Sequence, residues 1–119
     1  MSTSAAGALS EAVAVQLLGA RGYRVVERNF RVRSAELDVV ATDRAGVLCF
    51  VEVRSRATGE FGGAADTIDH QKRAKVTRGA RAYVALRQPQ FETARFDVVA
   101  ITGGSAELIR DAWRLEQDL

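Results

Sequence analysis

Apolar and polar residues recur along the chain at spacings that predict two helices. Residues 4–20 place apolar side chains at helical intervals without a proline, which predicts a helix with a broad apolar face. Residues 68–87 keep helical spacing, but their polar positions are largely basic, and Pro89 prevents the helix from continuing. We expect Asp66 or Thr67 to cap this second helix.

The remaining segments predict strands. Residues 23–26 indicate a short strand after the first helix. Residues 35–42 and 47–56 are rich in β-formers and are separated by a short polar turn, so we pair them as an antiparallel hairpin. Residues 95–101 predict a further strand, and 107–109 a final edge strand. This order predicts an α/β fold with helices packed against a sheet.

Length and composition narrow the classes of protein. The chain has 119 residues, of which 47% are hydrophobic, and we expect one domain over residues 1–119 that buries roughly two thirds of its unfolded surface. The single Cys49 and the lack of zinc-ligand spacing exclude zinc fingers and disulfide scaffolds. No apolar stretch reaches the roughly 20 residues of a membrane span, so a cytoplasmic protein without a membrane partner is expected.

The first strand of the predicted hairpin carries carboxylates in an otherwise apolar setting. Because alternate side chains of a strand share a face, Glu36, Asp38 and Val40 should point one way. Leu37 and Val39 should point the other way. Burial of a carboxylate is costly, so carboxylates in strands that are otherwise apolar are the first candidates for catalytic or metal-binding residues.

The second strand repeats this feature with Glu52 and Arg54 on one face and Cys49 on the opposite face. If the hairpin register places Asp38 beside Glu52, two oxygen donors converge, as a hard cation such as Mg²⁺ requires. The metal would polarise a phosphodiester and activate a water, and Arg54 would steady the charge on the phosphate. This chemistry is hydrolysis without a covalent intermediate.

A structural alternative stays open at this point. Glu36 or Asp38 could pair with Arg54 in a partly buried ion pair that only holds the hairpin in register. Spacing alone does not separate an ion pair from a metal site.

Several short segments carry information in the identity of their residues as well as in their spacing. They are Asn29-Phe30-Arg31, Glu36-Leu37-Asp38, Phe50-Val51-Glu52-Val53-Arg54-Ser55-Arg56, Lys72 and Arg95-Phe96-Asp97. Together they resemble the YraN family of small bacterial proteins, over about residues 11–101. That family resembles the restriction-endonuclease-like nucleases, and the archaeal Holliday-junction resolvases in particular. The resemblance implies a restriction-endonuclease-like fold with a central mixed sheet of about four to five strands flanked by helices.

The resemblance also implies roles for individual residues. Asp38 matches the Asp of the nuclease signature, and Glu52 the first residue of its Glu-X-Lys, both metal ligands. Val53 would contribute its backbone carbonyl, and Glu11 matches an acidic residue that resolvase-like members bring to the cluster. Arg54 departs from the signature Lys, and because its pKa lies above about 12 it is a poor proton acceptor. Catalytic candidates are therefore Glu11, Asp38, Glu52 and Arg54, with Mg²⁺, or alternatively Mn²⁺, as cofactor.

Basic residues near this constellation are candidates for binding DNA. Arg31, Arg33 and Arg56 flank the acidic strands, and Lys72 shares a helical stripe with apolar residues and also matches the family pattern. The alternative for any single arginine is a solvated surface charge, and for Glu11 an ordinary acid near a helix start.

These observations predict a Mg²⁺-dependent endonuclease acting on structured or branched DNA. The alternatives are a catalytically inactive nucleic-acid-binding domain of the same fold and a protein-interaction module, which the small net charge of +2 favours. By resemblance to dimeric resolvases, a homodimer is expected. Arg95 and Asp97 are expected to form a structural ion pair or a cross-strand contact, and Trp113 to anchor the core or a dimer.

Overall fold

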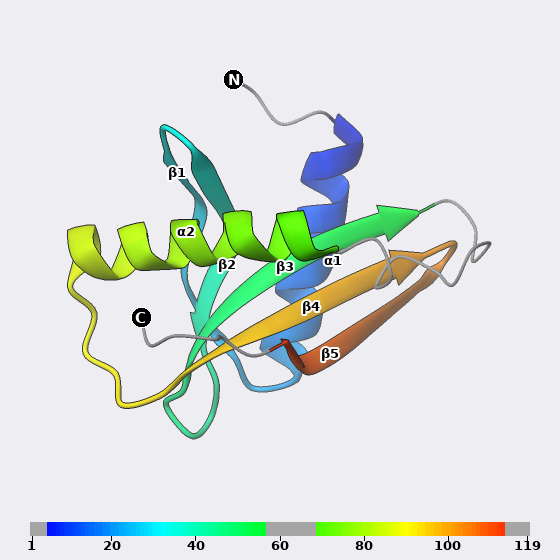
Figure 1. The fold of residues 1–119 in the computed structure, drawn as a ribbon. Helices are drawn as coiled ribbons and strands as arrows, with labels where there is room; N and C mark the ends of the chain where they lie inside the picture. The colour runs from blue at the N-terminus through cyan, green and yellow to red at the C-terminus, as the bar shows by residue number, and fades with distance from the viewer. Residues whose placement is uncertain (1–4, 57–68, 114–119) are drawn as a thin grey trace.

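The computed structural model describes residues 5–56 and 69–113, with side chains for 7–55 and 69–113. Figure 1 shows two helices and five strands in the order α1 (Ala5–Ala20), β1 (Arg24–Val32), β2 (Ala35–Thr42), β3 (Leu48–Arg56), α2 (His70–Arg87), β4 (Ala94–Thr102) and β5 (Ser105–Trp113). Among these residues, no helix is long and apolar enough to cross a bilayer.

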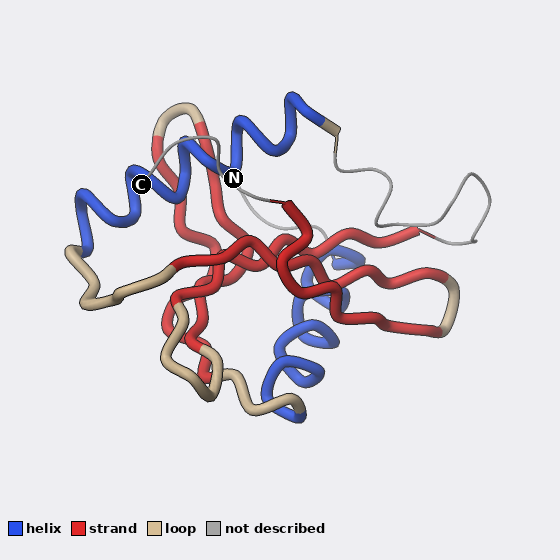
Figure 2. Tube along the Cα trace, turned by 60° about the horizontal axis from the view of Figure 1, so that its bottom comes forward, coloured by secondary structure: helices blue, strands red, loops and turns tan. Residues whose placement is uncertain are grey.

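The strands form one mixed sheet in the order β1-β2-β3-β4-β5. β3 and β4 run parallel, because α2 connects them, and the other neighbours are antiparallel. The two helices lie on opposite faces of the sheet (Figure 2). The predicted α/β fold with a mixed sheet and flanking helices is confirmed, and it is compatible with a restriction-endonuclease-like fold.

Each helix covers its own apolar cluster. Beneath α2 the buried side chains include Phe50, Phe96 and Tyr83, whose rings meet in edge-on and tilted contacts. Beneath α1 the buried residues are smaller, with Leu18 and Val51 among them. The alternation of β3 is confirmed, because Cys49 and Val51 lie under α1 whereas Leu48 and Phe50 lie under α2.

Two strands are longer than the sequence predicts. β1 runs to Val32, through a polar and basic stretch in which Phe30 alone is fully buried, because pairing with β2 satisfies its backbone. β5 spans Ser105–Trp113 and pairs with β4. The ring of Trp113 stacks on Phe96 with centroids 4.7 Å apart, so Trp113 belongs to the core.

The cap predicted for the second helix is wrong. Asp66 and Thr67 lie outside the described residues, and the residue that caps α2 is Asp69. The Asp69 carboxylate accepts a hydrogen bond from the Lys72 backbone N–H at 2.9 Å, which satisfies one of the free donors of the first turn.

The predicted alternation of β2 fails at Leu37, which lies beneath α2 together with Val40 and not on the opposite face. Val39 keeps its predicted face under α1. Leu37 lies beyond the end of the β2–β3 ladder, and next to it Asn29 of β1 has a φ of 54°, in the left-handed region. Strict alternation requires regular strand geometry, from which this backbone conformation departs.

Candidate metal and nucleic-acid site

The candidate site lies where β2 and β3 separate. Their ladder ends at the pair Val39↔Val51, whereas β3 stays paired with β4 to its last residue. Asp38 and Glu52 are the next residues in this register, at the opening of the fork. The Asp38 Oδ2 accepts a hydrogen bond from the Val53 backbone N–H at 2.8 Å, so Asp38 satisfies a donor that β2 no longer reaches. The predicted register is confirmed.

Glu52 is the most buried member of the site, with 1% of its surface exposed. Neither of its carboxylate oxygens accepts a hydrogen bond with good geometry from the residues that the structure describes. Its counter-charge comes from α2, where the Lys72 ammonium lies 3.2 Å from Glu52 Oε1. Lys72 precedes the buried Val76 by one helical turn, and this spacing directs its stem toward the sheet.

The two carboxyl groups disfavour each other's ionisation. Burial, and then the nearby Asp38 charge, raise the pKa of Glu52 to about 8, against the opposing effect of Lys72. Burial also raises the pKa of Asp38, against the Val53 N–H and Lys72, which lower it. A cation placed between the two carboxylates would reverse both shifts.

Glu11 reaches the same region from α1 but has partners of its own. Its side chain is buried, as the expected orientation toward the sheet requires, and Oε1 accepts hydrogen bonds from Asn29 Nδ2 at 2.9 Å and Arg28 Nε at 3.2 Å. The Glu11 charge also acts on Asp38. Within residues 5–56 and 69–113, no group of three or more His, Cys, Asp or Glu side chains has the geometry to hold a metal.

The basic candidates are distributed around the fork. Arg54 is partly buried, and its charge lowers the pKa of Glu52. Arg31 forms an ion pair with Glu36 at 2.9 Å on the β1–β2 hairpin, and Arg33 is exposed in the turn of that hairpin. The side chain of Arg56 lies outside the described part of the chain.

The donor set at the fork fits a hard divalent cation. Glu52 offers two buried oxygens, of which Oε1 lies 3.2 Å from the Lys72 ammonium, and Asp38 keeps Oδ1 in addition to the oxygen that accepts from the Val53 N–H. Carboxylate oxygens are the ligands that Mg²⁺ prefers, and a buried carboxylate without donors is otherwise costly. The carboxylate oxygens of Asp38 and Glu52 are therefore suitable ligands for Mg²⁺ or Mn²⁺.

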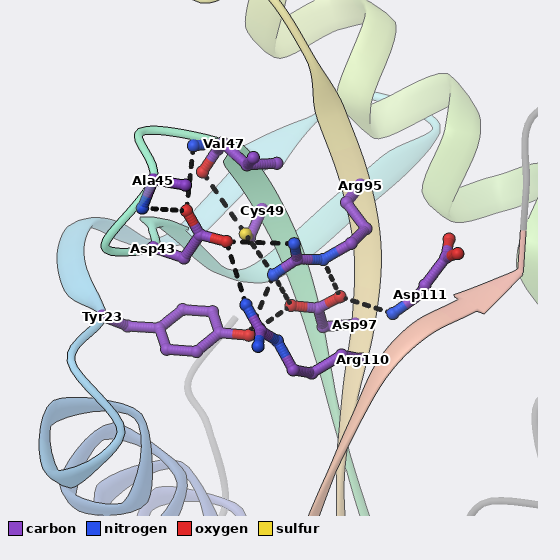
Figure 3. Close-up of polar contacts among 9 residues, drawn as sticks. All are labelled: Tyr23, Asp43, Ala45, Val47, Cys49, Arg95, Asp97, Arg110 and Asp111. Carbon is purple, nitrogen blue, oxygen red and sulfur yellow. Dashed lines mark hydrogen bonds and ion pairs between the residues drawn. The ribbon is translucent and has the colours of Figure 1, made fainter.

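A second polar cluster, on the α1 side of the sheet, was only partly predicted. Arg95 Nε lies 2.8 Å from Asp97 Oδ1, which confirms the expected ion pair. The Tyr23 hydroxyl donates to Asp97 Oδ2 at 2.7 Å, and Arg95 and Arg110 both contact Asp43 at 3.0 Å (Figure 3). The only sequence signal was a charged pair in an apolar strand, because the partners come from three other segments.

This second cluster is structural and not nucleophilic. Cys49 lies within it, with its Sγ 3.2 Å from Arg95 Nη2. Burial first, and then the charge of Asp97, raise the pKa of the Cys49 thiol to about 12, so it stays protonated. Asp97 is fully buried, yet every oxygen has a donor, including the Asp111 backbone N–H at 2.9 Å.

Comparison with known proteins identifies the family. The uncharacterised protein family UPF0102 matches residues 10–101, a range that contains Glu11, Asp38, Glu52 and Lys72. The chain is a member of UPF0102. This confirms the resemblance to the YraN family.

Members of UPF0102 from distant bacteria align along most of the chain. A relative from Ralstonia pickettii strain 12J is 40% identical over 117 residues, which are 96% of this chain and 94% of the relative. One from Burkholderia pseudomallei strain 1710b is 43% identical over 92% of this chain and 76% of its own. One from Chlorobaculum parvum is 39% identical over 85% and 78%. These UPF0102 proteins carry the family name without a stated activity.

Proposed function

We propose that this protein is a metal-dependent endonuclease that hydrolyses phosphodiester bonds in structured or branched DNA. The observation that carries the proposal is Glu52, a buried carboxylate that accepts no hydrogen bond of good geometry from the described residues and has the Lys72 ammonium 3.2 Å from Oε1, beside Asp38 at the fork between β2 and β3. Structural carboxylates in this protein behave differently, since every oxygen of Asp97 has a donor.

Asp38 and Glu52 would hold the metal, with the Val53 carbonyl as a further ligand. The Val53 N–H already fixes the Asp38 carboxylate, which keeps Asp38 directed into the fork. Glu11, held by Arg28 and Asn29, adds negative charge on the α1 side. When bound, Mg²⁺ or Mn²⁺ supplies an activated water and polarises the phosphodiester.

The cations of the site bind and orient the phosphate. Arg54, at the position of the signature Lys, offers a bidentate guanidinium to the non-bridging oxygens. The Lys72 ammonium, 3.2 Å from Glu52, adds a second positive charge at the same point. A guanidinium is a poor proton acceptor, so in this proposal Arg54 binds the phosphate and leaves activation of the water to the bound metal.

A second candidate function rests on Arg54 itself. A guanidinium binds phosphate well but replaces the signature ammonium, which favours a domain that binds nucleic acid without cleaving it. The two functions share the fork and differ only in turnover.

The deciding experiment is incubation of the protein with labelled four-way junction, flap, single-stranded and duplex DNA in Mg²⁺, Mn²⁺ or EDTA, following binding and cleavage together. We expect products with either metal and none in EDTA. Asp38→Asn should abolish the products and leave DNA affinity unchanged or slightly raised, since removing a carboxylate removes repulsion toward phosphate.

The matched control is Glu107→Gln, an exposed carboxylate on β5 that should cleave like the wild type. Tight binding without products would support the second candidate. Neither binding nor products would exclude both functions and leave a protein-interaction module.

A further inference from the structure

Helix α2 carries lysines and arginines but no aspartate or glutamate between His70 and Arg87. It contacts the sheet through Val76, Gly79, Ala80 and Tyr83, so the basic residues occupy its flanks and outer surface. One-signed charge along a whole helix repels itself, and a polyanion relieves that repulsion.

Some of these charges are used within the fold. The Arg73 guanidinium lies 5.7 Å from the Trp113 ring, and Arg87 pairs with Glu27 at 2.9 Å. Lys75 and Arg78 differ, because both are exposed and neither forms an ion pair with the residues that the structure describes. These two charges are available to a ligand.

Lys75 and Arg78 extend the candidate site along one flank of α2. They follow Lys72 at intervals of three residues, and because each such step turns about 60° around the helix, the row slants from the sheet side at Lys72 toward solvent at Arg78. The flank faces the β1–β2 hairpin, because a Cβ added to Gly79 would lie 3.1 Å from the Leu37 side chain. The stripe therefore begins at Glu52 and runs beside the hairpin whose turn carries the exposed Arg33.

The stripe is long enough to span more than one phosphate of a DNA strand. Three residues of helix rise about 4.5 Å, so Arg78 lies about 9 Å along the axis from Lys72. Phosphates of one DNA strand advance about 3.4 Å along the duplex axis. Cations along this row can contact phosphates of a strand whose next phosphate lies at the Asp38–Glu52 fork.

We infer that Lys75 and Arg78 form a track that holds the phosphate backbone of a DNA duplex arm leading into the Asp38–Glu52 fork. The position of the reacting phosphate rests on the proposed function, but the binding role of the track does not require cleavage. The track reads charge and backbone shape and gives no base specificity.

The test is the salt dependence of binding to a labelled 20-base-pair duplex in EDTA, by fluorescence anisotropy. Lys75→Ala with Arg78→Ala should weaken binding at least tenfold at moderate salt and reduce the slope of log K against log salt by about 2. The control, Arg21→Ala with Arg44→Ala, removes the same charge from exposed residues at the C-terminal end of α1 and the β2–β3 turn, far from α2 (Figure 1). It should change affinity less than twofold and leave the slope unchanged.

Equal weakening by both double variants, wild-type binding by the α2 variant, or no binding of DNA by the wild type would overturn the inference. A slope change with single strands but not with the duplex would overturn the duplex assignment. Duplex binding that depends on Lys75 and Arg78, without cleavage under any metal, would support the track and reject the nuclease.

Discussion

Glu52 is a buried carboxyl group whose ionised form is disfavoured by its surroundings. Its oxygens accept no hydrogen bond of good geometry from the described residues, and the Lys72 ammonium, 3.2 Å from Oε1, is its ion-pair partner. Its pKa is raised from 4.5 to about 8. A raised folded-state pKa means that the carboxyl supports folding below about pH 4.5, and that this support is lost as pH rises through about 8.

We therefore predict that Glu52→Gln stabilises the metal-free protein, and increasingly so with pH. Near pH 5 the two proteins should unfold at similar temperatures, because the wild-type carboxyl is neutral. At pH 8.5 the variant should gain about 2–4 kcal/mol in the free energy of unfolding. Thermal unfolding in EDTA at pH 5.0, 7.0 and 8.5 measures this.

Glu107→Gln, on the exposed face of β5, is the control and should show no such trend. A gain for Glu52→Gln that is the same at all three pH values would show that the folded-state pKa is not raised. Added Mg²⁺ should reverse the order at pH 8.5, because only the wild type offers the carboxylate.

At the scale of elements, the placement of α2 on β2 decides where Lys72 arrives. Gly79 lies in the interior of the helix, where glycine lowers helix stability, and its absent side chain allows close approach to β2. A Cβ at this position would meet Leu37 Cδ2 at 3.1 Å and the Glu36 carbonyl oxygen at 3.5 Å. Larger residues must push the helix away from the strand.

Gly79→Leu should therefore lower the free energy of unfolding by about 1–3 kcal/mol, as expected for overpacking. Gly19→Leu is the matched control, since nothing lies within 4 Å of a Cβ there and leucine favours the helix. Urea denaturation of both variants checks this. Equal effects at the two glycines would contradict close approach of α2 to β2.

At the scale of the whole molecule, the cluster around Asp97 joins segments that are distant in the chain. Tyr23 follows α1, Asp43 lies in the β2–β3 turn, Arg95 is on β4 and Arg110 is on β5. Burial tends to raise the pKa of Asp97, but hydrogen bonds from Arg95, the Asp111 backbone and Tyr23 outweigh it and lower the pKa. Such a carboxylate stabilises the fold above the unfolded pKa and loses this effect as pH falls through the folded one.

Asp97→Asn should cost about 3–5 kcal/mol at pH 7, because it leaves the partly buried Arg95 without its closest partner. The cost should shrink as pH falls below the unfolded pKa of about 4, because the unfolded wild type then binds a proton that the folded carboxylate resists. Chemical denaturation at pH 7 and pH 3 measures the difference. Tyr23→Phe, which removes one donor, should cost about 1–3 kcal/mol, and a pH-independent cost of Asp97→Asn would argue against the lowered pKa.

Much of the candidate site follows from local pattern. Strand alternation correctly predicts that Glu52 and Cys49 face opposite sides, and the short β2–β3 turn fixes the register that brings Asp38 to Glu52. The prediction fails for Leu37, which lies beyond the end of the β2–β3 ladder and beside the left-handed Asn29 of β1. The predicted length of β1 is too short, because backbone pairing with β2 extends the strand through polar residues. The apolar-polar pattern of those residues does not indicate a strand.

The sequence by itself determined the α/β class, the central hairpin and the family, because these depend on periodicity and on residues close together in the chain. Only the tertiary structure decided that Lys72 neutralises Glu52 from the helix, that Glu11 is held by Arg28 and Asn29, and that α2 presents a basic flank beside the fork. Tyr23 and Asp97 are 74 residues apart, and their contact depends on how both helices and the sheet pack together. Local spacing does not encode such contacts, since they arise when the whole chain closes around its two apolar clusters.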